Sequence, residues 1–144
     1  MRNFYTALHT YFNQTSGGVH NDFWNDIGGR LYHGEAEVPD SAELPYCVLL
    51  HVVDTQVDTF KNKLDEIVIQ FSIFSDKTSP VEIHDTMTHL KALFNDCSLT
   101  IVGGKLVHFF WLSDGLVRED VETPAGIKGI WHFHCDYTAV LERT

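Results

Sequence analysis

The sequence has few of the features that nucleic-acid binding or membrane insertion would require. Its 10 lysine and arginine residues face 20 aspartates and glutamates, which gives a formal net charge of −10. Nucleic acid is held by cations that neutralise its phosphates, so a protein that grips DNA is not expected. The longest apolar run is Tyr46 to Leu50. A membrane-spanning helix needs about 20 such residues, so we expect no contact with a membrane.

Cysteines and catalytic motifs are also scarce. Cys47, Cys97 and Cys135 leave one thiol unpaired in any disulfide scheme, and none belongs to a Cys-x-x-Cys motif. Cys47 and Cys135 stand in apolar strand patterns, so we expect buried, reduced thiols. The sequence contains neither a P-loop nor a Gly-x-Ser-x-Gly motif. We therefore predict a protein that is not an enzyme and that binds no cofactor.

The clearest structural signal is an alternating segment at residues 65–75. Ile67, Ile69, Phe71 and Ile73 alternate with mostly polar residues, which predicts a strand with one buried face. Because 144 residues are typical of one domain, we expect a single domain over residues 1–144.

A helix is predicted directly after this strand, over residues 80–96. Ser79 and Glu82 have the spacing of a capping box, and Pro80 suits the first helical position because it lacks an N–H group. The residues that follow at helical spacing form one apolar stripe for packing on the sheet: Ile83, Met87, Leu90 and Phe94.

Weaker patterns complete the predicted fold. Helical spacing indicates a helix near residues 4–12 and a helical turn at 23–27. A polar excursion is predicted at 55–64, between strands, and the other predicted strands cover residues 44–55, 99–102, 105–121 and 127–142. Turns are expected at Gly103-Gly104 and at 123–126. Together these elements predict an α+β domain with a mainly antiparallel sheet of four to five strands and helices packed on one face.

Nine histidines raise an alternative, a small metal-dependent or ligand-binding enzyme that uses His132 and His134. These two residues share a strand face with Asp136, but His132 and Asp136 are separated by about 13 Å at a strand rise of about 3.3 Å per residue. His134 is predicted opposite residue 115, which leaves His108 about 23 Å away along the neighbouring strand. No zinc-type spacing of cysteine and histidine is present. We therefore predict no metal site.

An assembly role fits the strand patterns better. Residues 109–112 are apolar on both faces of a strand, and such a strand needs cover from two sides. We predict that a second copy of the chain supplies one cover. The excursion at 55–64 and the hairpin end near 118–125 are the predicted contact regions, and the candidate interface residues are Val57, Phe60, Lys61, Lys63, Arg118, Glu119 and Asp120.

The order of motifs resembles a known family. Residues 29–32 (Gly-Arg-Leu-Tyr), an acidic loop, and residues 44–49 (Leu-Pro-Tyr-Cys-Val-Leu) resemble the opening of the tail-completion or tail-terminator proteins of long-tailed bacteriophages. The resemblance continues through the strand at 65–75 and the helix at 80–96 to about residue 141. The chain departs from the family pattern in its long segment at 14–26 and in its histidine content.

This resemblance implies a structural virion protein in the tail or neck, assembled in the host cytoplasm. Such proteins have a small α+β fold and form a ring, typically a hexamer, on the head-proximal end of the tail tube. The ring ends tube polymerisation and joins the tail to the head. The implied partners are further copies of the chain, the tail tube protein and a head connector or stopper protein, with DNA passing without specific binding. Another neck protein, such as a head-completion or stopper protein, is the second alternative.

Overall fold

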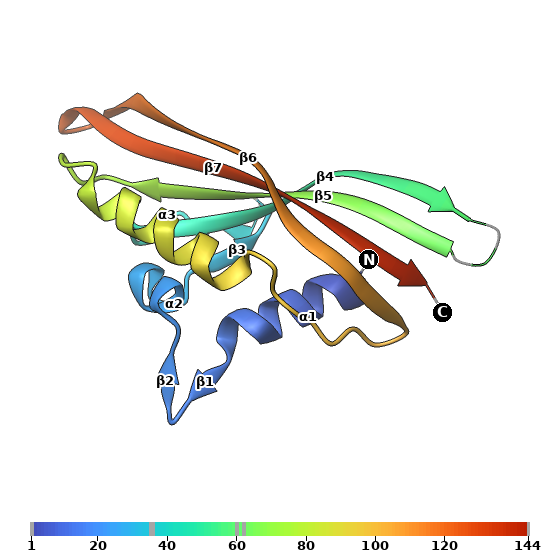
Figure 1. The fold of residues 1–144 in the computed structure, drawn as a ribbon. Helices are drawn as coiled ribbons and strands as arrows, with labels where there is room; N and C mark the ends of the chain where they lie inside the picture. Colours follow the sequence, from blue (N-terminus) through green and yellow to red (C-terminus); the bar gives the residue numbers. More distant parts are fainter. Residues whose placement is uncertain (1, 35–36, 60, 62, 144) are drawn as a thin grey trace.

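The protein is an α+β domain in which one sheet is covered by helices on one face (Figure 1). This computed structural model describes residues 2–34, 37–59, 61 and 63–143. Among these residues, no helix is both long enough and apolar enough to cross a membrane. The elements are α1 (Arg2–Asn13), β1 (Thr15–Ser16), β2 (Val19–His20), α2 (Asp22–Ile27), β3 (Leu31–His33), β4 (Tyr46–Asp58), β5 (Lys63–Ser75), α3 (Val81–Phe94), β6 (Gly104–Thr123) and β7 (Gly126–Arg143).

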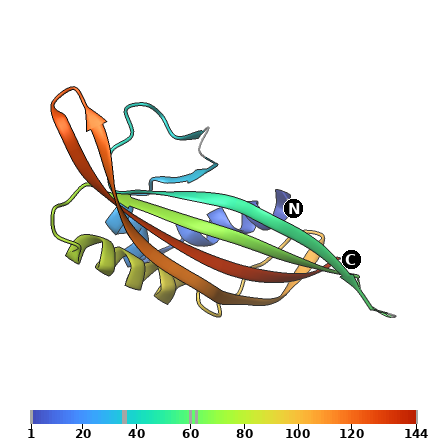
Figure 2. The same ribbon diagram turned by 90° about the horizontal axis from the view of Figure 1, so that it is seen from above.

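The main sheet has the strand order β3-β4-β5-β7-β6, and β1 and β2 form a separate small hairpin. Every neighbouring pair in the main sheet is antiparallel except β3 and β4, which are parallel. The β4–β5 and β6–β7 hairpins turn at opposite ends of the sheet (Figures 1 and 2). The predicted fold class is therefore confirmed, with β5 and β7 as its central strands.

The core lies between the sheet and the helices. Ile67, Ile69, Phe71 and Ile73 are each at most 1% exposed, as the alternation in β5 predicts. Phe71 stacks on Phe94 of α3 with ring centroids 4.7 Å apart. Aromatic side chains bury the largest apolar areas, so this contact fixes α3 on the sheet.

The start of α3 differs from the predicted capping box. Pro80 is the N-cap, and the Ser79 hydroxyl accepts a hydrogen bond from the Val81 N–H at 3.3 Å. The Glu82 carboxylate instead accepts a bond from the Ser75 hydroxyl at 2.8 Å. Glu82 reaches Ser75 because the short connection between β5 and α3 places the end of β5 beside the first turn of α3.

The strand boundaries correct two predictions and add one strand. The excursion at 55–64 is mostly sheet, because β4 and β5 stay paired up to Asp58 and Lys63. Residues 99–102 are not a strand. They lead from α3 to β6, and the Val102 carbonyl accepts a bond from the Asn3 side chain of α1 at 2.8 Å. Strand β3 was not predicted, since three residues are too few for a periodic pattern.

Candidate assembly interface

The first predicted contact region lies at the turn of the β4–β5 hairpin, here called the β4–β5 tip (residues 57–64). Val57 is 44% exposed although it belongs to a paired strand. Lys61 and Lys63 are exposed in the turn and at the start of β5. Phe60, the fourth predicted residue of this region, lies outside the described residues. Among its described residues, the tip therefore presents the apolar Val57 and the cations Lys61 and Lys63 to solvent.

One arginine braces the β4–β5 tip. The guanidinium of Arg143, at the end of β7, is 3.1 Å from the Asp58 carboxylate and 3.0 Å from that of Asp65. These contacts join the ends of β4, β5 and β7. Because the Asp65 side chain is only 17% exposed, its ion pair is less screened by solvent than a surface pair. The described ends of β4 and β5 are thus held to the end of β7.

The second region lies at the other end of the sheet, here called the β6–β7 tip (residues 117–131). The Arg118 guanidinium lies over the Trp131 ring at 4.9 Å from its centroid. A Cβ atom at Gly129 would be 2.2 Å from Nη2 of Arg118, so the glycine leaves room for this cation. Glu119 and Asp120 are exposed, and a Glu119 oxygen is 3.5 Å from Nδ1 of His132.

An ion pair ties the β6–β7 tip to the rest of the sheet. Nζ of Lys128 is 2.7 Å from the Asp76 carboxylate, just after β5. The hydrogen bond from Lys128 lowers the pKa of Asp76, with a smaller contribution from its charge, against an opposing effect of partial burial. The Asp76 carboxylate is therefore ionised at neutral pH and holds the tip beside β5.

The predicted interface residues thus fall into two groups rather than one. Val57, Lys61 and Lys63 lie together at one end of the sheet, and residues 118–120 lie together at the other (Figures 1 and 2). A single partner surface of ordinary size cannot easily contact both groups on one copy. Two different contacts, one at each end, suit the arrangement better.

Exposed hydrophobic side chains are concentrated on two strands, a distribution that was not predicted from the sequence. Of the twelve large ones among the described residues, three lie on β4 and five on β6, the two outer long strands, whereas none lies on β5. They are Val52, Val53 and Val57 on β4, and Val107, Trp111, Leu112, Val117 and Val121 on β6. The two-sided apolar pattern at 109–112 pointed to part of this set, but finding the rest requires knowing which strands are outermost.

The histidines of β7 lie on the face of the sheet that carries no helix. His134 pairs with Gly115, as predicted, and a Cβ atom at Gly115 would be 2.7 Å from the His134 ring. The His132 ring stacks on Phe74 at 4.4 Å, and 6.0 Å separates the two histidine rings. In the described part of the chain, no three histidine, cysteine, aspartate or glutamate residues are grouped so that they could hold a metal ion.

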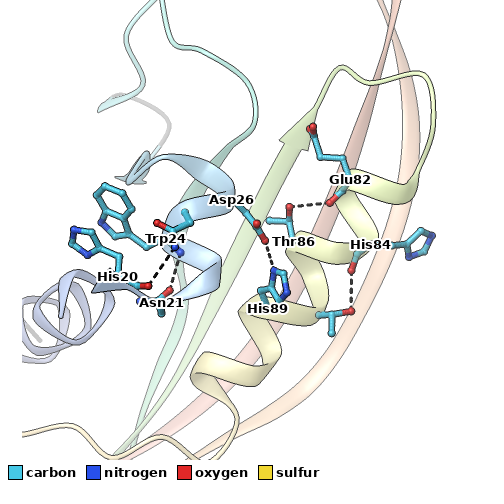
Figure 3. A network of polar contacts seen from close by, with 10 residues as sticks. His20, Asn21, Trp24, Asp26, Glu82, His84, Thr86 and His89 are labelled. Atoms are coloured by element: carbon cyan, nitrogen blue, oxygen red, sulfur yellow. Dashed lines mark hydrogen bonds and ion pairs between the residues drawn. The ribbon is translucent and has the colours of Figure 1, made fainter. Parts of the chain in front are cut away.

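His89 has a structural setting between two helices (Figure 3). Its Nδ1 atom is 2.5 Å from the carboxylate of Asp26 on α2. The hydrogen bond to Asp26 raises the pKa of His89, helped by the charges of Asp26, Asp22 and Asp85 and opposed by partial burial. Asn21 begins α2 by accepting a bond from the Trp24 N–H at 2.7 Å. The His89–Asp26 pair therefore fastens α2 to α3.

The three cysteines are free thiols, as predicted, and Cys47 and Cys135 are buried. Burial raises the pKa of Cys135 to about 12 and that of Cys97 to about 11. Only the thiolate is a strong nucleophile, so neither residue suits nucleophilic chemistry at neutral pH.

A family model described as "Tail completion protein gp17" matches residues 26–142, which include β3 to β7 and α3. Among solved structures, the fold is similar to a chain of the "Virion of native gene transfer agent (GTA) particle", with a TM-score of 0.71 and 12% sequence identity. That match covers 95% of this chain and 92% of the other. No curated protein sequence matches this chain significantly.

Proposed function

The chain belongs to the tail completion protein gp17 family, and on this basis we propose that it forms a ring at the head-proximal end of a phage tail tube. Family membership makes it a structural protein of the virion tail that associates with other virion proteins. In the proposal, the ring stops polymerisation of the tube and joins the tail to the head. Its partners are further copies of itself, the tail tube protein and a head connector or stopper protein.

The observation that carries this proposal is the extent of the family match. It includes the whole main sheet and α3, which together form the frame of the domain. The similarity in fold to a chain of a gene transfer agent virion supports the same kind of role, since that chain also belongs to a particle. We propose no catalytic activity, because contact between subunits suffices for this task.

The separation of the two tips supports a ring as well. A ring subunit needs two different flanks that close by rotation, in addition to two axial faces. The β4–β5 tip and the β6–β7 tip lie at opposite ends of the sheet and carry different side chains. We assign Val57, Lys61, Lys63, Arg118, Glu119 and Asp120 to contacts with neighbouring copies or with the tube, and include Phe60 on the sequence evidence alone.

The charge of the chain suits a passage for DNA. At a formal net charge of −10 per copy, a ring would repel phosphates unless its cations were concentrated on the inner wall. DNA would then pass through without being held. The purified protein should accordingly show no DNA binding at physiological salt in a gel-shift assay, whereas submicromolar binding would contradict this part of the proposal.

Electron microscopy of particles that carry a labelled copy of the protein tests the role directly. We expect the label at the junction of head and tail, and particles without the protein should have free heads and tails of irregular length. A label elsewhere on the particle would refute the role.

Deletion of residues 57–62 tests the assignment of the β4–β5 tip. A normal ring and normal head–tail joining in that variant would show that the tip makes no essential contact.

A further inference from the structure

The main sheet ends in two open strand edges that run in opposite directions. β3 pairs with β4 only at residues 47–49, so no described strand borders β4 from Leu50 to Asp58. On the other side, β6 is the outermost strand over residues 104–123. The four long strands β4, β5, β7 and β6 alternate in direction, because each neighbouring pair is antiparallel. The edge strands β4 and β6 are therefore antiparallel to each other.

The hydrogen bonds to β3 fix which backbone groups of β4 face outward. The Cys47 N–H donates to the Arg30 carbonyl at 3.0 Å, and the Leu49 carbonyl accepts from the Gly34 N–H at 2.9 Å. The backbone groups of these residues thus point away from β5, and in an antiparallel ladder this direction alternates. The bulge at 51–53 shifts the register by one residue. Beyond it, the β4 residues whose backbone N–H and C=O groups point away from β5 are Asp54, Gln56 and Asp58.

The same alternation, carried across β5 and β7, gives the outward residues of β6. Successive residues of β5 direct their backbone N–H and C=O groups alternately toward β4 and toward β7. Successive residues of β7 direct theirs alternately toward β5 and toward β6. Beyond the register shift at 111–113, the β6 residues with outward backbone groups are Asp114, Leu116, Arg118, Asp120 and Glu122. Both edges thus present a regular ladder of donors and acceptors.

Neither edge carries full protection against pairing. Natural edge strands are protected by charged side chains, above all lysine, by proline, by short length or by bulges, and both of these edges carry acidic side chains, among them Asp54 on β4 and Asp120 on β6. Residues 50–58 of β4 contain no lysine, arginine or proline and have one bulge, at 51–53. β6 has two register shifts, but residues 113–123 pair with β7 without a break. Eight exposed hydrophobic side chains also line these two strands, as described above.

We propose that copies of this chain join head to tail by strand pairing, with residues 53–58 of β4 placed antiparallel to residues 113–123 of β6 in the next copy. The sheet then continues around the assembly as one antiparallel sheet, and β-augmentation supplies the main-chain hydrogen bonds. The inference rests on the proposed ring, which provides the neighbouring copy. The partner strand comes from a second copy because each sheet has two different edge strands, β4 and β6, that run in opposite directions. A heterologous contact needs two such different surfaces on one copy.

Backbone-selective substitutions test the pairing. Gln56→Pro removes an outward N–H without removing a β4–β5 bond, and Gln56→Ala is the matched control that keeps the N–H. Glu122→Pro and Glu122→Ala form the equivalent pair on β6. We expect all four variants to keep the circular dichroism spectrum of the wild type. The proline variants should fall at least tenfold in incorporation into tails, and the alanine variants should remain near wild type. Wild-type incorporation of both proline variants would overturn the pairing.

Cross-linking in assembled particles tests which edges meet. A chain with Gln56→Cys and Asp120→Cys, in a Cys97→Ser background, is treated with a bis-maleimide linker. We expect a ladder of covalent oligomers from the double variant and monomers from each single variant. Monomers from the double variant, or dimers from Gln56→Cys alone, would overturn head-to-tail pairing even if microscopy places the protein at the tail end. Absence of the wild-type protein from tails would instead refute the proposed function, and this inference with it.

Discussion

The two faces of strand β5 present a direct contrast within one segment of chain. On the helix-covered face, Ile69, Phe71 and Ile73 are fully buried under α1 and α3. On the other face, Val68, Gln70 and Phe74 are only partly buried, although Ser72 between them is buried, and no described helix covers this face (Figure 2). The first face is complete in a single copy. The second face is covered less completely and the outer strand edges are open, which separates the residues that stabilise the fold from those available for assembly.

Core truncation should give the largest effect. Phe71→Ala removes a fully buried ring that packs on Phe94 and Tyr137, and we expect it to lower the free energy of unfolding by about 3–5 kcal/mol. Phe74→Ala, on the open face of the same strand, should cost about 1 kcal/mol. Urea unfolding followed by tryptophan fluorescence measures both. Equal losses would mean that the two faces do not differ as described.

An edge substitution should abolish assembly with little effect on stability. Val117 is 49% exposed on β6 within the proposed paired segment, so Val117→Asp should change the free energy of unfolding by less than about 1 kcal/mol while preventing incorporation into tails. Val102→Asp is the matched control, because Val102 is 78% exposed but lies outside the sheet. Loss of incorporation in both variants would indicate a general effect of negative charge rather than a role for the edge.

A smaller effect is expected at the β6–β7 tip. In Gly129→Ala the new methyl group displaces the Arg118 guanidinium from the Trp131 ring, at a cost of about 0.5–1 kcal/mol. The Trp131 fluorescence should change in the same way as in Arg118→Ala, measured on chains in which the other tryptophans are replaced by phenylalanine. An unchanged emission spectrum in Gly129→Ala would show that the glycine is not needed to seat the cation.

The smallest predicted effect depends on pH. The Asp26 carboxylate raises the pKa of His89, so their stabilising interaction is present below the ordinary histidine value and is lost as pH rises through the raised value. Both side chains are partly exposed, at 35% and 27%, so the contribution is at most about 1 kcal/mol. Asp26→Asn should therefore lower the melting temperature at pH 6 more than at pH 9. An equal decrease at both values would exclude a charge-dependent contact.

The sequence predicted those parts of the fold in which local pattern and tertiary packing agree. The alternation in β5, the apolar stripe of α3 and the pairing of His134 with Gly115 all follow from periodicity and turn position. The strand ends at 55–64 were not predicted, because a polar composition suggests a loop. Cross-strand pairing and the Arg143 ion pairs keep residues 55–58 and 63–64 in the sheet instead.

The candidate assembly surfaces were predictable only in part. Arg118 and Lys61 could be identified as exposed from local charge, but nothing local places them at opposite ends of the sheet. The open edges depend on strand order, which results from contacts distant in sequence such as β5 with β7. The exposure of a valine such as Val53 indicates a candidate interface only once β4 is known to be an outer strand.

Hydrogen–deuterium exchange of the free chain and of the chain in assembled tails tests the central claim most directly. We expect assembly to slow exchange of the outward amides in residues 54–58 of β4 and 114–122 of β6. The amides of α1 and α3, which are already bonded and packed in a single copy, should exchange as before. Slowed exchange confined to the helices, with both strand edges unchanged, would contradict the account.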